Sequence, residues 1–236
     1  MGNAYFQFKQ FRIGQEHCAM KVSTDACIQG AWTPLAPEVK NVWDIGTGTG
    51  LLSLMIAQRC PGGTIDAVEI DAAAAAQAAE NIRHSVFSDR VQLHHGDALC
   101  WNTEKQYELI ICNPPFFTGS LKGPDEQRNL ARHTGSLNLE TLAGLITAKL
   151  SENGYASVLL PLSETGKWAT AASGKGLFVN HMLRVMPFEH SSANRAVLIC
   201  SRRQSTLQED TMVIYREPGV YTERFTELMR PFYLNL

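Results

Sequence analysis

Short apolar runs alternate with longer segments of helical periodicity from Asn41 onward. The runs predict buried strands near residues 41–44, 64–69, 91–95, 107–112 and 155–160, with helices between most of them. Strands that alternate with helices pair in parallel through right-handed crossovers. The pattern therefore predicts a parallel, doubly wound α/β sheet.

The pattern changes character after residue 176. Residues 178–187 and 196–203 form two long strand-like stretches, joined by a polar turn at residues 191–194. Strands that follow each other through a short turn pair antiparallel. We therefore expect an antiparallel pair at the edge of the parallel sheet.

Three signals predict helix ends. Asp71 and Thr222 are typical N-cap residues, the first for an alanine-rich helix and the second for a final helix that runs toward Met229. Asn153-Gly154 is typical of a helix C-terminus and comes just before the fifth predicted strand.

The first 24 residues are mixed and aromatic, which predicts an antiparallel flap or arm. Thr24-Asp25 can cap a short helix that ends before Pro34. The aromatic residues of the arm are Tyr5, Phe6, Phe8 and Phe11.

Composition is that of an ordinary globular chain. The 236 residues are 44% hydrophobic and 19% charged, which fits one α/β domain with a sizeable core. The formal net charge of −2 means that any nucleic-acid contact needs a local basic patch. No apolar stretch approaches the length of a membrane span, and no signal peptide is expected.

The six cysteines show no C-x-x-C pairing and lie mostly in apolar segments. They therefore predict reduced thiols of a cytosolic protein, and neither a disulfide framework nor a metal site. His94-His95 is not expected to bind a metal ion as a pair, because neighbouring residues on a strand point to opposite faces.

A glycine-rich turn, D-I-G-T-G-T-G at residues 44–50, follows the first strand of the alternating region and precedes a helical run. Glycines allow a ligand to approach the backbone closely. A dinucleotide fingerprint needs a third glycine at position 51, where Leu51 stands instead. The turn therefore suits a ligand without phosphate, such as S-adenosylmethionine, whose ammonium Asp44 can face.

Carboxylates follow the next two strands. Glu69, roughly 20 residues beyond the turn, is placed to accept both hydroxyls of a ribose. Asp97 follows the third strand and can accept from the exocyclic amine of an adenine, or else simply cap the next segment. Since parallel strands end at the same edge of a sheet, these side chains are expected to share one site.

The fourth strand ends at N-P-P-F, residues 113–116. The prolines cannot donate to a sheet, so the strand must stop there. The Asn113 amide oxygen and the Pro114 carbonyl can then accept both protons of a planar NH2 group, while Phe116 stacks on its ring. Asn113, Pro114, Pro115 and Phe116 are the candidate catalytic residues, although a plain turn explains the tetrapeptide equally well by itself.

A long polar loop at residues 117–136 follows directly. Long loops beside a site are usually functional, and a basic one favours contact with phosphates. The candidate RNA-binding residues in it are Lys122, Arg128, Arg132 and His133.

Taken together, the glycine turn, Glu69, Asp97 and N-P-P-F resemble class I methyltransferases that act on exocyclic or amide nitrogens. Three further stretches are similar, more narrowly, to the bacterial tRNA1(Val) adenine-37 N6-methyltransferase family. They are the arm F-x-F-K-x-F…M-K-x-x-T-D…G-A-W (residues 6–32), the loop R-x-x-A-R-H (residues 128–133) and the terminal Phe232-Tyr233-Leu234.

This resemblance implies a Rossmann-like class I methyltransferase fold, with a mainly parallel seven-stranded twisted sheet, antiparallel C-terminal edge strands and helices on both faces. Residues 1–34 would be an arm and short helix that pack on the cofactor site, and residues 35–236 the catalytic domain. The implied cofactor is S-adenosylmethionine and the implied substrate is adenine 37, next to the anticodon of tRNA1(Val). A cytoplasmic monomer without metal or membrane contact is expected.

The cofactor-binding residues that the resemblance implies are Lys21, Thr24, Asp44, Gly46, Gly48, Gly50, Glu69, Asp97, Ala98 and Asn113.

Other activities use the same N-P-P-F chemistry. Guanine N2 methylation of ribosomal RNA and N5 methylation of a protein glutamine remain alternatives, because the same acceptors can hold either nitrogen. A catalytically silent RNA-binding module is a different class, which the complete set of carboxylates disfavours. A nicotinamide dehydrogenase is disfavoured by Leu51.

Overall fold

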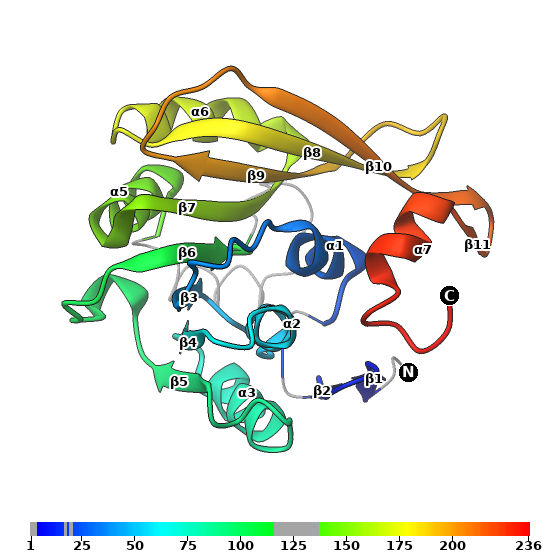
Figure 1. Ribbon diagram of the computed structural model, residues 1–236, viewed down its shortest axis with the longest axis horizontal. Coiled ribbons are helices and arrows are strands. Elements are labelled where there is room, and N and C mark those ends of the chain that lie inside the picture. The colour runs from blue at the N-terminus through cyan, green and yellow to red at the C-terminus, as the bar shows by residue number, and fades with distance from the viewer. Residues whose placement is uncertain (1–3, 17, 19–20, 116–136) are drawn as a thin grey trace, which may run out of the picture.

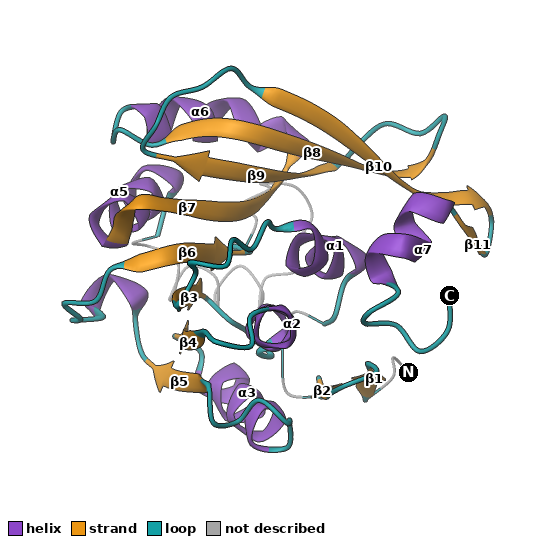
Figure 2. Ribbon diagram, in the orientation of Figure 1, coloured by secondary structure: helices purple, strands orange, loops and turns teal. Residues whose placement is uncertain are grey.

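A computed structural model describes residues 4–16, 18, 21–115 and 137–236 of the chain. Its centre is a nine-stranded sheet with the order β11-β10-β8-β9-β7-β6-β3-β4-β5 (Figure 1). Helices lie on both faces of this sheet (Figure 2). The predicted α/β fold class is confirmed.

The parallel half of the sheet follows the predicted strands closely. β6 pairs with β3, β3 with β4 and β4 with β5, all in parallel. Their bounds are β3 Asn41–Ile45, β4 Thr64–Glu69, β5 Val91–His95 and β6 Tyr107–Cys112.

The fifth strand begins earlier than predicted. β7 spans Leu150–Pro161 and follows helix α5 (Leu139–Lys149) directly, so Asn153-Gly154 lies inside a strand and the prediction of a helix C-terminus there was wrong. The pairing register with β6 shifts at this point, and a Cβ added at Gly154 would lie 2.8 Å from the Tyr107 carbonyl oxygen. The glycine is therefore explained by a close approach of two backbones at a strand irregularity.

The predicted antiparallel pair is present as β8 (Phe178–Phe188) and β9 (Arg195–Ser201). The sheet continues beyond it with β10 (Gln208–Glu217), parallel to β8, and the short antiparallel β11 (Val220–Tyr221). It therefore has nine strands where seven were expected. Only Met212 and Ile214 of β10 are buried, which left a weak apolar signal.

Two apolar layers cover the sheet. α1 (Thr24–Trp32), α2 (Leu51–Arg59), α3 (Ala72–Arg83) and α7 (Glu223–Met229) contribute to the core on one face, and α5 and α6 (Thr165–Ser173) to the core on the other. Two 3₁₀ turns, η1 (Ala98–Cys100) and η2 (Leu162–Glu164), follow β5 and β7. No helix in the described residues has the length and apolar character needed to cross a membrane.

Polar side chains cap the N-termini of three helices at or next to the predicted positions. The side chains of Asp71 and Thr222 accept hydrogen bonds from the backbone N–H groups of Ala74 and Phe225, so both predicted N-caps are confirmed. At α1 the N-cap is Ser23, whose hydroxyl accepts from the Ala26 N–H, and the helix begins at Thr24. The predicted Thr24-Asp25 cap was therefore one residue late.

The N-terminal arm is an antiparallel pair, β1 (Tyr5–Gln7) and β2 (Arg12–Gly14), as predicted. It lies beside the C-terminus of the chain (Figure 1), where Phe8 bridges to Tyr233 and the Lys9 N–H donates to the Phe232 carbonyl at 2.8 Å. The rings of Phe6, Phe8 and Tyr233 pack together in this contact. The two ends of the sequence thus form one buried aromatic cluster.

Candidate functional site

The carboxyl ends of four neighbouring strands bring the predicted site residues to one edge of the sheet. Ile45, near the end of β3, is in register with Val68 on one side and with Cys112 on the other. Glu69 at the end of β4 is in register with His95 at the end of β5. The residues that follow these positions are therefore neighbours in space although they are far apart in the sequence.

The glycine turn leaves open space beside its backbone. Gly46 and Gly48 have positive φ angles of 68° and 58°, and a Cβ added at either would meet nothing within 4 Å. The turn is held by the Gly46 and Thr47 N–H groups, which donate to the Val68 carbonyl at 2.9 and 3.1 Å. It is a rigid cradle with room for a ligand against it.

Asp44 is fully buried beneath this turn, and one of its carboxylate oxygens is occupied. Oδ2 accepts from the Thr47 hydroxyl at 2.6 Å, the Ser53 hydroxyl at 2.7 Å and the Ser53 N–H at 3.1 Å. Ser53 lies in the first turn of α2, so a carboxylate of the chain itself takes the place that a phosphate occupies at other helix N-termini. This contact explains physically why the turn does not suit a pyrophosphate.

The other oxygen, Asp44 Oδ1, is buried and has no hydrogen-bond partner among the described residues. Burial raises the pKa of Asp44 to about 6, with a smaller contribution from the charge of Glu69, while the bonds from Thr47 and Ser53 oppose the shift. An unpartnered buried acceptor with this charge suits a cationic group such as an ammonium.

Glu69 connects the glycine turn to the start of α3. Its Oε2 accepts from the Gly48 N–H at 2.8 Å, and its Oε1 accepts from the Asp71 N–H at 2.9 Å. Each carboxylate oxygen can accept a second bond, so both remain able to receive a ligand hydroxyl. Contact with a ribose stays a prediction that this geometry permits.

Asp97 performs the capping role that was the alternative interpretation. Its Oδ1 accepts from the Leu99 N–H at 2.9 Å at the start of η1. The preceding Gly96 N–H donates to the Glu69 carbonyl at 2.8 Å, which ties this turn to the Glu69 strand end. Contact with an adenine amine remains a prediction.

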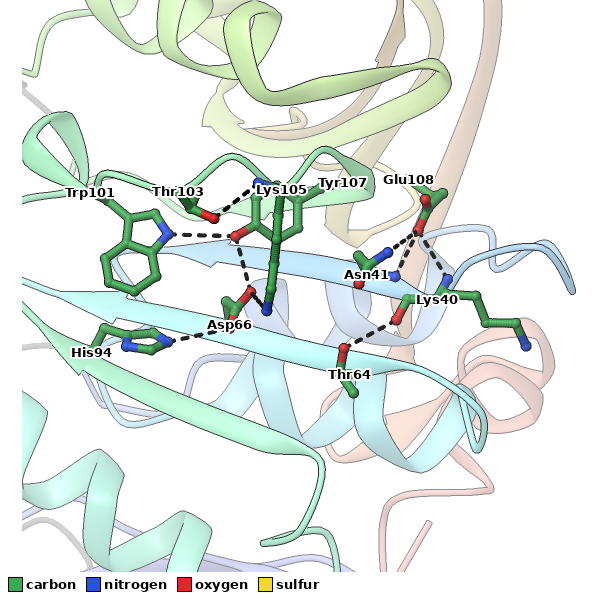
Figure 3. Close-up of polar contacts among 10 residues, drawn as sticks. All are labelled: Lys40, Asn41, Thr64, Asp66, His94, Trp101, Thr103, Lys105, Tyr107 and Glu108. Carbon is green, nitrogen blue, oxygen red and sulfur yellow. Dashed lines mark hydrogen bonds and ion pairs between the residues drawn. The ribbon is translucent and has the colours of Figure 1, made fainter.

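A polar cluster around the buried Asp66 anchors the segment that follows Asp97 (Figure 3). Asp66 Oδ2 accepts from the Tyr107 hydroxyl at 3.0 Å and from Lys105 Nζ at 2.9 Å, while Asp66 Oδ1 lies 3.3 Å from His94 Nε2. The ring of His94 packs on Trp101 with centroids 4.0 Å apart. Sequence reasoning missed this cluster, for which the one available signal was an aspartate inside an apolar strand.

The Asn113 amide oxygen is another unpartnered acceptor at this edge. Oδ1 is buried and has no hydrogen-bond partner among the described residues. Pro114 is buried and Pro115 half-buried, and both line an apolar pocket together with Leu142 and Leu160. An apolar pocket thus lies directly beyond Asn113 in the chain, and the role of Asn113 as a clamp for an amine stays a prediction.

The remaining predicted residues differ in their positions. Lys21 is exposed, Thr24 is half-buried in the first turn of α1, and Ala98 is buried at the start of η1. Phe116, Lys122, Arg128, Arg132 and His133 lie outside the described residues.

Cys18 shows where the chain runs after the hairpin. Burial raises the pKa of its thiol to about 11, and the charges of Glu69 and Asp71 add to the shift. Asn81 of α3 ties the hairpin to the glycine turn, because its amide donates to the carbonyls of Gly14 and Thr49, both at 2.9 Å. The arm therefore passes beside the predicted cofactor residues.

The arrangement as a whole fits one kind of ligand. The unpartnered oxygens of Asp44 and Asn113, the Glu69 carboxylate and the open space beside the glycine turn suit a cationic, hydroxyl-bearing molecule without phosphate. Among the described residues, no group of three or more His, Cys, Asp or Glu could hold a metal ion.

Comparison with known proteins agrees with this geometry. A family model for the methyltransferase small domain matches residues 32–160. A crystal structure from Agrobacterium tumefaciens, described as a predicted O-methyltransferase, superposes with a TM-score of 0.67 over 90% of this chain and 100% of that chain, at 16% identity, which shows a shared fold.

Curated relatives match at higher identity. A protein of Dyadobacter fermentans is 41% identical over 99% of this chain and 98% of its own length, and one of a Shewanella species is 42% identical over 98% and 99%. Both carry the name tRNA1(Val) (adenine(37)-N6)-methyltransferase. The chain therefore belongs to the methyltransferase small domain family and, within it, to the family of tRNA1(Val) (adenine(37)-N6)-methyltransferases that these relatives represent.

Proposed function

We propose that this protein transfers a methyl group from S-adenosylmethionine to the exocyclic N6 of adenine 37, next to the anticodon of tRNA1(Val). The observation that carries the proposal is the pair of buried, unpartnered oxygens, Asp44 Oδ1 and Asn113 Oδ1, at neighbouring strand ends. The first suits the ammonium of the cofactor and the second suits the amine of the substrate. The names of the full-length relatives supply the identity of the RNA.

The cofactor would be held along the strand ends. Asp44 would face the ammonium of the cofactor, Glu69 its ribose hydroxyls and Asp97 its adenine amine. Gly46 and Gly48 would let the cofactor lie against the backbone of the turn. When bound, S-adenosylmethionine supplies an electrophilic methyl group on a sulfonium. Lys21, Thr24, Gly50, Ala98 and, beside its role toward the substrate, Asn113 complete the set of cofactor residues that we propose.

Asn113 and Pro114 act on the nucleophile. The lone pair of an adenine N6 is delocalised into the ring, which makes the nitrogen a poor nucleophile. When Asn113 Oδ1 and the Pro114 carbonyl accept hydrogen bonds from the two N–H groups of N6, they favour a more tetrahedral nitrogen. They also stabilise the positive charge that develops on this nitrogen. The same contacts aim the lone pair, and positioning of this kind is worth up to roughly 7–11 kcal/mol.

The substrate base must reach a pocket at the sheet edge, so it has to leave its stack or already lie in a loop. Phe116, beside the prolines, would hold the ring by stacking, worth about 1–3 kcal/mol per base. Adenine 37 lies in the anticodon loop, where bases are more accessible than in a duplex.

Removal of the Asp97 carboxylate is expected to weaken cofactor binding. Asp97→Ala should raise the cofactor Kd about 10-fold, because the adenine amine loses its hydrogen bond to a charged carboxylate. Calorimetry measures this directly.

Asp97→Asn is the matched control for capping, since it keeps an oxygen for the Leu99 N–H. An Asn variant with wild-type affinity would mean that Asp97 serves only as a cap.

The loop residues Lys122, Arg128, Arg132 and His133 are proposed to contact tRNA phosphates. Arg132→Glu should weaken tRNA binding and reduce the slope of log K against log salt by about 1 or more, because one phosphate contact is lost. Fluorescence titration at several salt concentrations gives both quantities. Arg83→Glu on α3 is the control for a general charge effect; equal behaviour of the two variants would remove the loop from the interface.

We further propose that residues 1–34 act as an arm over the cofactor site and residues 35–236 as the catalytic unit. The Asn81 link between Gly14 and Thr49 supports this division. All six cysteines are free thiols, which supports a cytoplasmic location. A monomer is sufficient for the proposed reaction, because one chain supplies every residue named for it.

The decisive experiment incubates the protein with labelled S-adenosylmethionine and total tRNA, followed by mapping of the modified nucleoside. Label on adenine 37 of tRNA1(Val) is the expected result. Parallel incubations with ribosomal RNA and with protein acceptors test guanine N2 and glutamine N5 methylation. Label found only in one of those would overturn the proposed substrate but not the cofactor.

A further inference from the structure

A buried glutamine on α1 contacts the strand end that carries the proposed clamp. Gln29 is fully buried. Its Nε2 donates to the carbonyl oxygen of Cys112 at 3.0 Å and to the carbonyl oxygen of Ser157 at 3.1 Å. The two bonds join the end of β6 to the interior of β7, which lies beside β6 in the sheet.

The Cys112 carbonyl belongs to the peptide group that leads into Asn113. Beyond Asn113 the backbone has no N–H at Pro114 or Pro115, so the clamp cannot be anchored there by backbone donors. A donor on the Cys112 oxygen therefore orients the last peptide plane before the clamp. That plane sets the direction in which the Asn113 side chain leaves the backbone.

The support behind Gln29 is rigid. Arg59 Nη1 on α2 donates to the carbonyls of Gly30 and Thr33, both at 2.8 Å, at the end of α1. A Cβ added at Gly30 would lie 2.7 Å from the Met55 sulfur, so the two helices are in close contact. A side chain held in this way transmits the position of α1 to the strand end.

A polar residue at this place needs an explanation. Gln29 stands among Ala26, Cys27, Ile28 and Ala31, all of which are buried. Its own Oε1 is buried without a partner among the described residues, which is unfavourable. An apolar side chain would avoid that cost but would remove the donor that Gln29 offers to the Cys112 and Ser157 carbonyls.

We propose that Gln29 is a positioning residue for the methyl transfer, and that it acts by holding the Cys112 carbonyl and thereby the Asn113 amide. The inference rests on the proposed function of Asn113. It also assigns a role to α1 before the family model begins, since the matched region starts at residue 32.

The test compares two variants on the same helix. Gln29→Met keeps the size of the side chain and removes both donors. It should lower kcat on tRNA about 10- to 100-fold, because small displacements of a positioning group cost this much, while the cofactor Kd stays within about twofold. Thr33→Val is the matched control: the Thr33 hydroxyl is also buried, donates to the Gln29 backbone carbonyl at 2.7 Å and bonds to the Ser157 hydroxyl at 2.7 Å, but it does not touch Cys112.

A second readout does not depend on activity. In protein labelled with ¹⁵N-asparagine, the side-chain amide resonances of Asn113 should shift in Gln29→Met and stay in place in Thr33→Val. If Gln29→Met does not fold, Gln29→Asn replaces it, because it retracts the amide by one methylene from the Cys112 oxygen.

Equal loss of kcat in the Gln29 and Thr33 variants, or an unmoved Asn113 resonance, would overturn the proposal. Failure of the proposed function is distinguishable, because it would appear as inactivity of the unmodified protein on tRNA while the resonance shift persists.

Discussion

Asn113→Ala is expected to reduce kcat at least about 10²–10³-fold, the loss that follows removal of one group matched to charge developing in a transition state. The cofactor Kd should change little, because the assigned partner of Asn113 Oδ1 is the amine of the substrate. Single-turnover kinetics with tRNA, together with calorimetry of cofactor binding, measure the two quantities separately.

Asn41→Ala is a suitable control for Asn113→Ala. Asn41 is the first residue of β3, at the end of the strand opposite the glycine turn. Its side chain donates to Glu108 Oε2 at 3.4 Å (Figure 3). Its replacement should leave kcat unchanged. A loss of cofactor affinity in Asn113→Ala comparable with its loss of kcat would contradict the role assigned to the amide.

Asp44→Asn is expected to weaken cofactor binding about 10- to 100-fold, since hydrogen bonds to charged groups contribute about 1.5–3 kcal/mol. Asp44 Oδ1 attracts the proposed ammonium only when the Asp44 carboxyl is ionised. Because burial raises the pKa of Asp44 from 3.8 to about 6, the affinity of the unmodified protein should fall as the pH drops through about 6.

The contribution of Asp44 to the free energy of unfolding of the cofactor-free protein should depend on pH in the opposite direction. A carboxyl whose pKa is higher in the folded state than in the unfolded state keeps its proton better when folded. Its contribution favours folding below about pH 4 and is lost as the pH rises through about 6. Unfolding titrations with and without the cofactor, compared with Asp44→Asn, separate the two effects.

Asp210→Asn is the control for Asp44→Asn. Asp210 lies near the start of β10, and its hydrogen bond with Arg224 lowers the pKa of its carboxyl. Its replacement should not change the pH dependence of cofactor affinity. An affinity that stays constant from pH 7 down to 5 in the unmodified protein would show that Asp44 does not bind a cation in its ionised form.

The strand ends were predictable because a single local rule determines them. An apolar run that meets a glycine or a proline has to stop, as at Gly46 after β3 and at Pro114 after β6. The parallel register then brings these positions together without further information. β10 was not predictable in this way, because only two of its side chains are buried and its place in the sheet depends on its pairing with β8.

The amino-acid sequence alone determined the alternation of strands and helices, the glycine turn, the strand end at N-P-P-F and the order of the carboxylates, because each depends on residues close together in the chain. Only the tertiary structure decided how the second oxygen of Asp44 is left without a partner, that Gln29 reaches Cys112, and that Asp66 gathers His94, Lys105 and Tyr107. These contacts join residues separated by tens of positions. Burial and hydrogen bonding across such distances depend on the packed fold, and no local pattern in the sequence encodes them by itself.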